Sequence, residues 1–232
     1  MKCRVVLAML FVIFGYALSG DYGISLSLKG TMTSNTRMMY DVNVSSYTQA
    51  DRNVSSSFGY GADVRSNLFF DRFFLGFSVE IVRGSTTVSQ IYPLLQNLRV
   101  PMEEGFEARM AELSGYYIVP ISSETILFYL GGGVGYYTGK RVYSVAGYHT
   151  TNLRSTSNIG IHVLTGTEFR IFPNVALRTE LKFRDPYFDA TTRFDKSFVI
   201  VEGQRVALSQ QERVTRINLY GINYVAGLVF SI

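Results

Sequence analysis

The chain has 232 residues, of which 47% are apolar and 17% charged, and its formal net charge is +4. This charge is too small to indicate a nucleic-acid-binding protein, and removal of Lys2 and Arg4 would lower it by two, to +2. One cysteine, at position 3, and two histidines leave no basis for a disulfide framework or a dedicated metal site, and no cofactor is expected.

The first 19 residues have the pattern of a secretory signal peptide. Lys2 and Arg4 form a positive start, and an apolar run over 5–14 and the small-x-small sequence Ala17-Leu18-Ser19 follow it. The apolar run is shorter than the roughly 20 residues of a membrane-spanning helix, which argues against the alternative of a retained anchor. We therefore predict a signal peptide over 1–19 and one mature domain over 20–232.

The mature chain alternates apolar and polar residues with a period of two, which is typical of β-strands. Eight segments show this pattern: 22–29, 57–65, 72–83, 106–119, 125–138, 158–171, 175–184 and 216–232. The fourth is the weakest, because Glu107 and Arg109 fall on its apolar side. A further hairpin is predicted over 197–208, with its turn at Glu202-Gly203, and counting it as two strands gives a ten-stranded alternative.

The hairpin over 158–184 carries the most informative faces. Ile159, Ile161 and Val163 share one face, whereas Arg178 and Glu180 lie on the other. No long apolar run follows the signal peptide, so a membrane-embedded chain would have to be a closed barrel, which pairs every backbone group. The 16 tyrosines and 17 phenylalanines fit the aromatic girdles of such a barrel. We predict an all-β fold: a single antiparallel up-and-down transmembrane β-barrel of eight strands, expected to be a monomer.

The connections between the predicted strands alternate in length. Those after the first, third, fifth and seventh strands are long, and those after the second, fourth and sixth are short. Long extracellular loops and short periplasmic turns are typical of outer-membrane barrels. Both termini are therefore expected in the periplasm.

Several segments together resemble a known family. YLGGGVGYY, GIHVLTGTEFRIFPNVALRTELKFR and a last strand that alternates to the carboxyl end are similar to the outer-membrane β-barrel domain family that includes small OmpA- and OmpX-type barrels. The resemblance covers essentially all of the mature chain. It implies a place in the bacterial outer membrane, contact with outer-membrane lipid and lipopolysaccharide, and insertion by the barrel-assembly machinery. The chain departs from the family at Phe230-Ser231-Ile232, where an aromatic terminal residue is usual.

The inward face of the predicted barrel carries charges of both signs. An eight-stranded interior is filled by side chains, and an unpaired buried charge is costly, so we expect a structural ion-pair network in the lumen. Arg65 lies on this face, and the glycines at 131, 133 and 135 are expected to make room for long side chains. The predicted network consists of Glu80, Glu112, Glu168, Arg170, Arg178, Glu180, Lys182 and Arg184.

Three functional classes remain open at this level. A structural or surface-interaction role through long extracellular loops is favoured. The alternatives are a narrow channel for small solutes or ions and a lipid-modifying enzyme. We predict no enzyme and no catalytic residue, because His149 and His162 are the available histidines and neither has a visible nucleophile beside it in sequence. Loop cations could contact lipopolysaccharide phosphates or form a solvated rim: Arg37, Arg52, Arg99, Lys140, Arg141, Arg154, Arg193, Lys196, Arg205 and Arg213.

Overall fold

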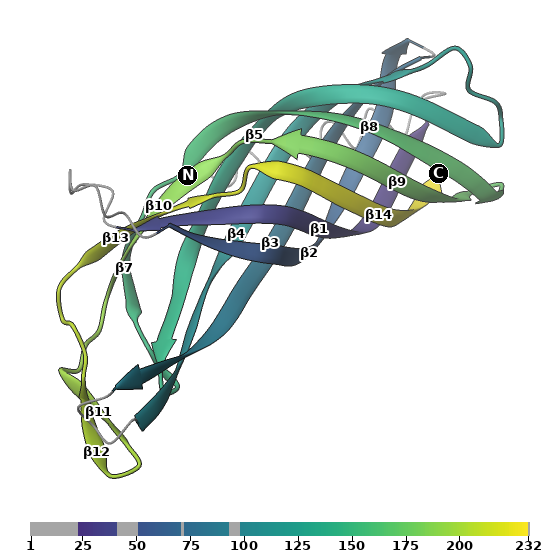
Figure 1. The fold of residues 1–232 in the computed structure, drawn as a ribbon. Helices are drawn as coiled ribbons and strands as arrows, with labels where there is room; N and C mark the ends of the chain where they lie inside the picture. Colours follow the sequence, from purple (N-terminus) through teal and green to yellow (C-terminus); the bar gives the residue numbers. More distant parts are fainter. Residues whose placement is uncertain (1–22, 41–50, 71, 93–97, 232) are drawn as a thin grey trace.

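The structure is a computed structural model, which describes residues 23–40, 51–70, 72–92 and 98–231. The predicted signal peptide over 1–19 lies outside the described residues, as do the central part of the first long connection and residues 93–97. The described chain is almost entirely strand, and its sheet closes on itself (Figure 1).

Eight antiparallel strands form a closed ring, which confirms the predicted fold class and strand number. In the ring each strand pairs with the next, and β14 returns to β1 through a register that runs from Ser25↔Ser231 to Thr33↔Asn223. The ring strands are β1 (Ile24–Tyr40), β2 (Asp51–Phe70), β3 (Phe73–Tyr92), β4 (Leu98–Ile118), β5 (Ile126–Val145), β8 (Asn158–Phe172), β9 (Val175–Arg184) and β14 (Gly221–Ser231).

The two ends of the barrel differ. The β2–β3, β4–β5 and β8–β9 connections are short and lie at the end that also holds Ile24 and Ser231. The other end carries β6 (Tyr148–His149), β7 (Thr151–Ser155), β10 (Tyr187–Arg193) and β13 (Arg213–Asn218), which continue the wall beyond the ring. We call these two ends the turn end and the loop end.

The hairpin predicted near 197–208 is present at the loop end. It consists of β11 (Phe198–Val201) and β12 (Gln204–Ala207), and its turn residues Glu202 and Gly203 have φ values of 50° and 78°. Two positive φ values at the turn are typical of a type I′ hairpin turn. The two strands form a sheet of their own, so the ten-stranded alternative is not adopted (Figure 1).

Several ring strands are much longer than predicted. The prediction placed connections over 30–56 and 84–105, whereas β1 continues to Tyr40, β3 to Tyr92, and β4 already begins at Leu98. These segments are polar because they pair beyond the apolar belt, where both faces tolerate polar residues. Pro101 fits inside β4 because the neighbouring strand β5 ends beside it. Its carbonyl oxygen accepts a hydrogen bond from the Ala146 N–H, just after the last residue of β5. The proline nitrogen points to the same side, where the ladder needs no further N–H donor.

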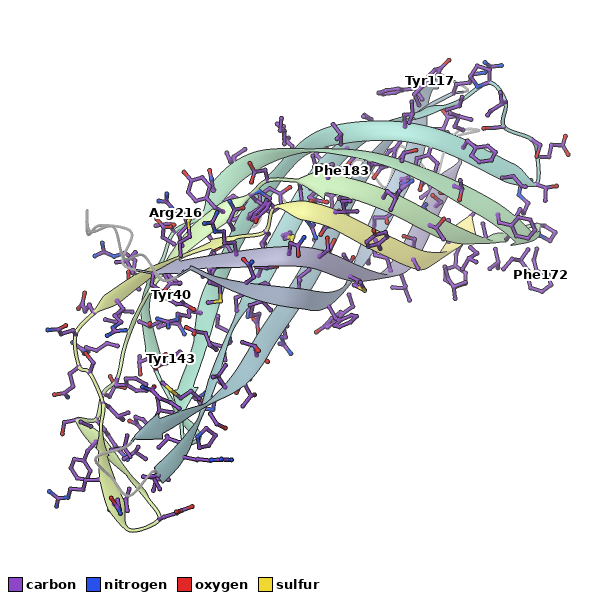
Figure 2. The ribbon with its side chains drawn as sticks, viewed as in Figure 1. Tyr40, Tyr117, Tyr143, Phe172, Phe183 and Arg216 are labelled. Atoms are coloured by element: carbon purple, nitrogen blue, oxygen red, sulfur yellow. The ribbon has the colours of Figure 1, made fainter. Side chains whose placement is uncertain are left out.

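The outer surface of the ring is an apolar belt. Its outward side chains are largely exposed, with Ile161 at 74%. Tyr117 and Phe172 stand on it near the turn end, whereas Tyr40 and Tyr143 lie at the loop end (Figure 2). Other members are Leu28, Phe77, Leu113, Val134, Ile159, Val163, Phe183 and Tyr224. A soluble protein would bury such a surface, whereas a lipid bilayer requires it.

Candidate functional site: the closed lumen

Polar residues at every second position of the ring strands converge inside the barrel. This follows from the two-residue period of a strand: the neighbours of the belt residues must point inward. Apart from Glu104 and Arg141, which pair with each other nearer the loop end, ten of these inward residues carry charge and take part in ion pairs. The cations are Lys29, Arg65, Arg178, Lys182 and Arg184, and the anions are Asp63, Glu80, Glu112, Glu168 and Glu180.

The part of this lumen network nearer the turn end centres on Arg178 and Arg65. Arg178 Nη1 donates to Asp63 Oδ1 at 2.7 Å, and its Nε donates to Glu168 Oε1 at 2.8 Å. Arg65 pairs with Glu180 and lies 3.2 Å from Asp63. The Arg65 guanidinium also stacks over the Tyr116 ring, with 3.8 Å from Cζ to the ring centroid, a favourable cation–π contact.

The part nearer the loop end centres on Arg184 and Glu112. Arg184 Nη2 donates to Glu80 Oε1 at 2.8 Å and its Nη1 lies 3.3 Å from Glu112 Oε1. Glu112 also accepts from Lys182 Nζ at 2.6 Å and from the Tyr137 hydroxyl at 3.0 Å. With the Ser78 hydroxyl, which donates at 3.4 Å, the Glu112 carboxylate has four charged or polar donors, which compensates its removal from water.

The lumen network is balanced in charge. Five cations face five anions, and the side chains of nine of the ten are at most 5% exposed, Glu168 being the tenth. Because each charge of the network is paired, an ion that entered the lumen would find no unpaired side chain of opposite charge there.

The structure brings together seven of the eight predicted network residues. Arg170 differs: it is exposed at the turn end and forms no ion pair with any described residue. Arg170 still pairs in register with the inward residue Ala176 and lines a cavity at the turn end with Arg65 and Glu168, so it lies on the inner face, at the open mouth of the lumen and beyond the paired charges. Arg65, which was predicted on the inner face, joins these seven. Lys29 and Asp63 complete the ten although they were not among the predicted set, and parity alone places both on the inner face.

Ser114 and His162 form a pair that sequence analysis missed. Ser114 Oγ lies 2.7 Å from His162 Nε2, and both side chains are buried. They come from β4 and β8, and Gly133 of β5 lies between them in register. Without a side chain at Gly133, the two groups can meet across β5. No local motif could reveal this contact, because it depends on three strands.

An apolar layer closes the lumen on the loop-end side of the network. Its residues are almost fully buried and come from β1 to β5, β10, β13 and the residue that follows β13: Met38, Val54, Val82, Phe106, Ala108, Met110, Tyr137, Phe188, Ala190, Ile217 and Leu219. Asn35, with φ of 60°, changes the alternation of β1, so that Thr33, Thr36 and Met38 all face inward. The lumen is thus closed twice, by charge pairing and by apolar packing.

The glycines of β5 fit the expectation that they make room. A Cβ on Gly135 would come within 2.4 Å of the Tyr137 hydroxyl, and one on Gly131 would meet Tyr116 at 3.0 Å. At Gly133 the obstacle is instead the backbone of β4, 1.9 Å away at the carbonyl of Leu113. The glycines therefore serve close packing.

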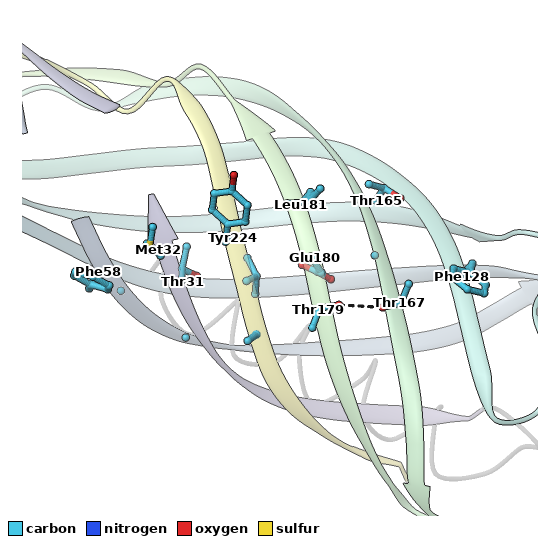
Figure 3. Close-up of a pocket in the computed structure, with 15 residues that line it drawn as sticks. Thr31, Met32, Phe58, Phe128, Thr165, Thr167, Thr179, Glu180, Leu181 and Tyr224 are labelled. Atoms are coloured by element: carbon cyan, nitrogen blue, oxygen red, sulfur yellow. Dashed lines mark hydrogen bonds between the residues drawn. The ribbon is translucent and has the colours of Figure 1, made fainter. Parts of the chain in front are cut away.

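A groove of about 670 Å³ crosses the outer face of the wall (Figure 3). Small outward residues form its floor, and the hydroxyls of Thr167 and Thr179 lie 2.9 Å apart within it. The floor follows one row of cross-strand pairs, and the Phe58 ring also lines the groove. The row consists of Phe128, Thr167, Thr179, Ala226 and Gly30. The groove faces the surroundings of the barrel and offers no path along the lumen.

Comparison with known proteins bears on the fold. No protein-family model matches the chain, and no curated protein matches it in sequence. Among solved structures the chain is similar to the outer membrane protein OprG from Pseudomonas aeruginosa, with a TM-score of 0.60 at 11% identity, over 91% of this chain and 95% of OprG. The chain folds as a small outer-membrane β-barrel.

Two further solved structures are similar to this barrel at lower scores. Ail of Yersinia pestis has a TM-score of 0.45 and 13% identity, over 92% of this chain and 100% of Ail. The outer membrane protease OmpT from Escherichia coli has 0.47 and 10%, over 92% and 98%. The fold and the apolar belt place this barrel in the bacterial outer membrane.

Neither a membrane-spanning helix nor a cluster of metal ligands is present among the described residues. No helix among them is long and apolar enough to cross a bilayer. No group of histidine, cysteine, aspartate and glutamate side chains in the described ranges has the arrangement of a metal site.

Proposed function

We propose that this barrel is a non-enzymatic, non-conducting outer-membrane protein that acts at the cell surface through its loop end. The head, as we call it, comprises β6, β7, β10 to β13 and the loop-end parts of β3, β4 and β5. The observation that carries the proposal is that the head has an apolar core of its own. Leu98, Val100, Val145, Phe194, Val206 and Leu208 form this core.

A core in the head supports a role for an ordered surface. Loops that merely close a barrel need no packed interior. A surface that recognises a partner benefits from rigidity, because it loses less conformational entropy when the partner binds. Ring contacts reinforce this core: Phe194 packs on Tyr143 and Tyr148 at centroid distances of 5.5 and 6.2 Å.

The chemistry of the head favours an acidic partner. A cavity of about 320 Å³ opens there, and Arg141, Arg193 and Arg213 line it together with Thr192 and Gln211. Arg141 is buried and pairs with Glu104, which fixes its position, whereas Arg213 is exposed. Guanidinium groups suit carboxylate, sulfate and phosphate groups by their fork geometry.

The closed lumen argues against the channel alternative. A conducting path would have to pass the balanced ion pairs and then the apolar layer, and both layers are packed. Water and ions enter such a double barrier only if side chains move.

The buried Ser114–His162 pair argues against the enzyme alternative. An activated serine needs a base that a third group orients, and His162 Nδ1 has no hydrogen-bond partner among the described residues. A lipid substrate would also have to reach the pair through the barrel wall.

The test combines two measurements on the full barrel. In planar bilayers, the wild type should show no discrete conductance steps. On cells that display the barrel, labelled polyglutamate and dextran sulfate should bind and neutral dextran should not, with R193Q/R213Q lowering the binding at least tenfold. The matched control R99Q/R154Q removes two exposed head cations outside the cavity and should retain most of it. Conductance steps in the wild type, or equal binding by both double variants, would refute the proposal.

A further inference from the structure

Three cations gather around one carboxylate on the outer face of the wall. Arg83 of β3 pairs in register with Glu107 of β4, and Glu107 pairs in turn with Lys140 of β5. Arg109 stands two residues from Glu107 on the same face of β4. All four face outward, opposite to the lumen, and we call them the wall cluster.

The geometry of the wall cluster positions its cations without neutralising them. Arg83 Nη2 lies 2.9 Å from Glu107 Oε2, Arg109 Nη2 lies 2.9 Å from Oε1, and Lys140 Nζ lies 3.5 Å from Oε2. The Glu107 side chain is 7% exposed, whereas those of Arg83, Arg109 and Lys140 are 62%, 65% and 47% exposed. The cluster therefore presents a net charge of +2 to its surroundings from cations held in place by one buried anion.

The wall cluster lies where the apolar belt ends. The outward residues of β3 are apolar from Phe73 to Ile81 and become polar at Arg83. Arg83 is ten residues beyond Phe73, about 33 Å along a strand at ~3.3 Å per residue. A strand tilt of about 40° reduces this to about 25 Å along the membrane normal, the usual height of the apolar band of such barrels.

Aromatic side chains mark the same level. Phe58 of β2 is the register partner of Arg83, and Tyr60 is the partner of Ile81. Both rings are outward and exposed. Tyrosine and phenylalanine at the rim of an apolar belt lie at the height of the lipid headgroups. The wall cluster thus faces the headgroup layer, and not bulk water.

A pocket of about 450 Å³ adjoins the wall cluster. Arg83, Glu107 and Lys140 line it together with Phe58, and Glu103 lines its loop-end side. A bound anion would avoid the Glu103 carboxylate and lie on the exposed side of the wall cluster, near Arg83 and Lys140; Arg109 does not line the pocket and lies on the belt side of Glu107. An apolar wall below and cations above match a molecule with acyl chains and an anionic headgroup.

We propose that the wall cluster binds a phosphate group of lipid A in the outer leaflet. The assignment to that leaflet rests on the proposed function, in which the loop end faces outward. Arg83 and Arg109 each use Nε and Nη2 toward Glu107, which leaves their Nη1 groups to donate to phosphate oxygens. Lys140 adds a third positive charge from the adjacent strand.

Native mass spectrometry of the purified barrel with added lipid A tests this site. The wild type should retain lipid A, R83Q/R109Q should lower its occupancy at least fivefold, and R99Q/R154Q should retain it. Lipid A without its phosphates should bind the wild type as weakly as intact lipid A binds R83Q/R109Q. E107Q removes the negative charge of the Glu107 side chain but keeps all three cations. The variant should therefore bind lipid A at least as well as the wild type.

Several outcomes would overturn the inference. Equal occupancy in R83Q/R109Q and R99Q/R154Q would show that the wall cluster is a structural ion-pair group alone. Equal retention of phosphatidylglycerol, or full competition by millimolar inorganic phosphate, would remove the assignment to lipid A. Heat-modifiable migration on gels verifies that each variant is folded. Loss of lipid A binding leaves polyanion binding by the head unchanged, so the two proposals fail separately.

Discussion

Arg178 of β9 and Asp63 of β2 meet across the lumen at 2.7 Å, although β14 and β1 separate their strands in the wall. Such a contact joins parts of the ring that share no backbone hydrogen bond. Ser27 of β1 adds to it by donating to Asp63 at 2.6 Å. The lumen network therefore connects opposite parts of the barrel wall through its interior, whereas the backbone hydrogen bonds connect adjacent strands around the circumference.

Breaking this cross-lumen pair should destabilise the barrel strongly. R178M leaves Asp63 with Arg65 as its remaining close cation, and loss of one partner of a buried pair costs about 3–5 kcal/mol. D63N/R178M removes both charges and should recover at least half of that loss. Urea unfolding in lipid vesicles, with D63N as the second single variant, measures the coupling. Additive losses in the double variant would show that the pair is not coupled.

The packing beneath Tyr137 gives a second prediction. G135A places a methyl group within 2.4 Å of the Tyr137 hydroxyl, which must then move away from Glu112. Overpacking of this kind costs about 1–3 kcal/mol. G30A is the matched control, because its Cβ would meet ordinary contacts at 3.9 Å on the outer face. Unfolding free energies of the two variants within 0.5 kcal/mol of each other, roughly the spread of neutral surface changes, would contradict this account.

Much of this arrangement could be predicted from the sequence because a strand has a strict two-residue period. Parity placed Glu180 and Lys182 in the lumen and Ile161 outside, and connection lengths gave the two ends. Partner choice could not be predicted in the same way. Ser114 meets His162 only because Gly133 separates them, and that relationship requires the register of three strands.

The differences between the predicted and observed strand lengths, and between the predicted and observed environment of Arg170, have physical causes as well. The strands were predicted too short because alternation of apolar residues stops at the edge of the belt, whereas backbone pairing continues to Tyr92 and Leu98. Arg170 shares the parity of Glu168 and does line the turn-end mouth of the lumen beside it, but there it is exposed to solvent and joins no ion pair among the described residues. Alternation of apolar residues therefore shows neither where backbone pairing ends nor where the lumen opens to solvent.

The apolar belt predicts a depth-dependent response to charge. Ile161 is paired with Val134, and this row lies near the middle of the belt. I161R should cost about 2–4 kcal/mol, the usual effect of a cation at the bilayer midplane of a barrel. L153R changes an exposed leucine of β7 in the head and should cost less than about 1 kcal/mol. Equal losses, measured by urea unfolding in vesicles, would show that Ile161 does not face lipid.

Conduction should require both closures of the lumen to be breached. Removing Phe106 and Phe188 opens the apolar layer, but an ion would still meet the paired residues around Glu112. Removing Lys182 and Glu112 together leaves the apolar layer intact. F106A/F188A and E112Q/K182M should therefore each remain silent in planar bilayers, whereas the combined quadruple variant should show small discrete steps. Conductance steps from either double variant alone would mean that the layer which that variant leaves intact does not seal the lumen. Silence from a folded quadruple variant would show that other residues form the seal. The ion pairs around Arg178 and Arg65 would then be the remaining closed layer.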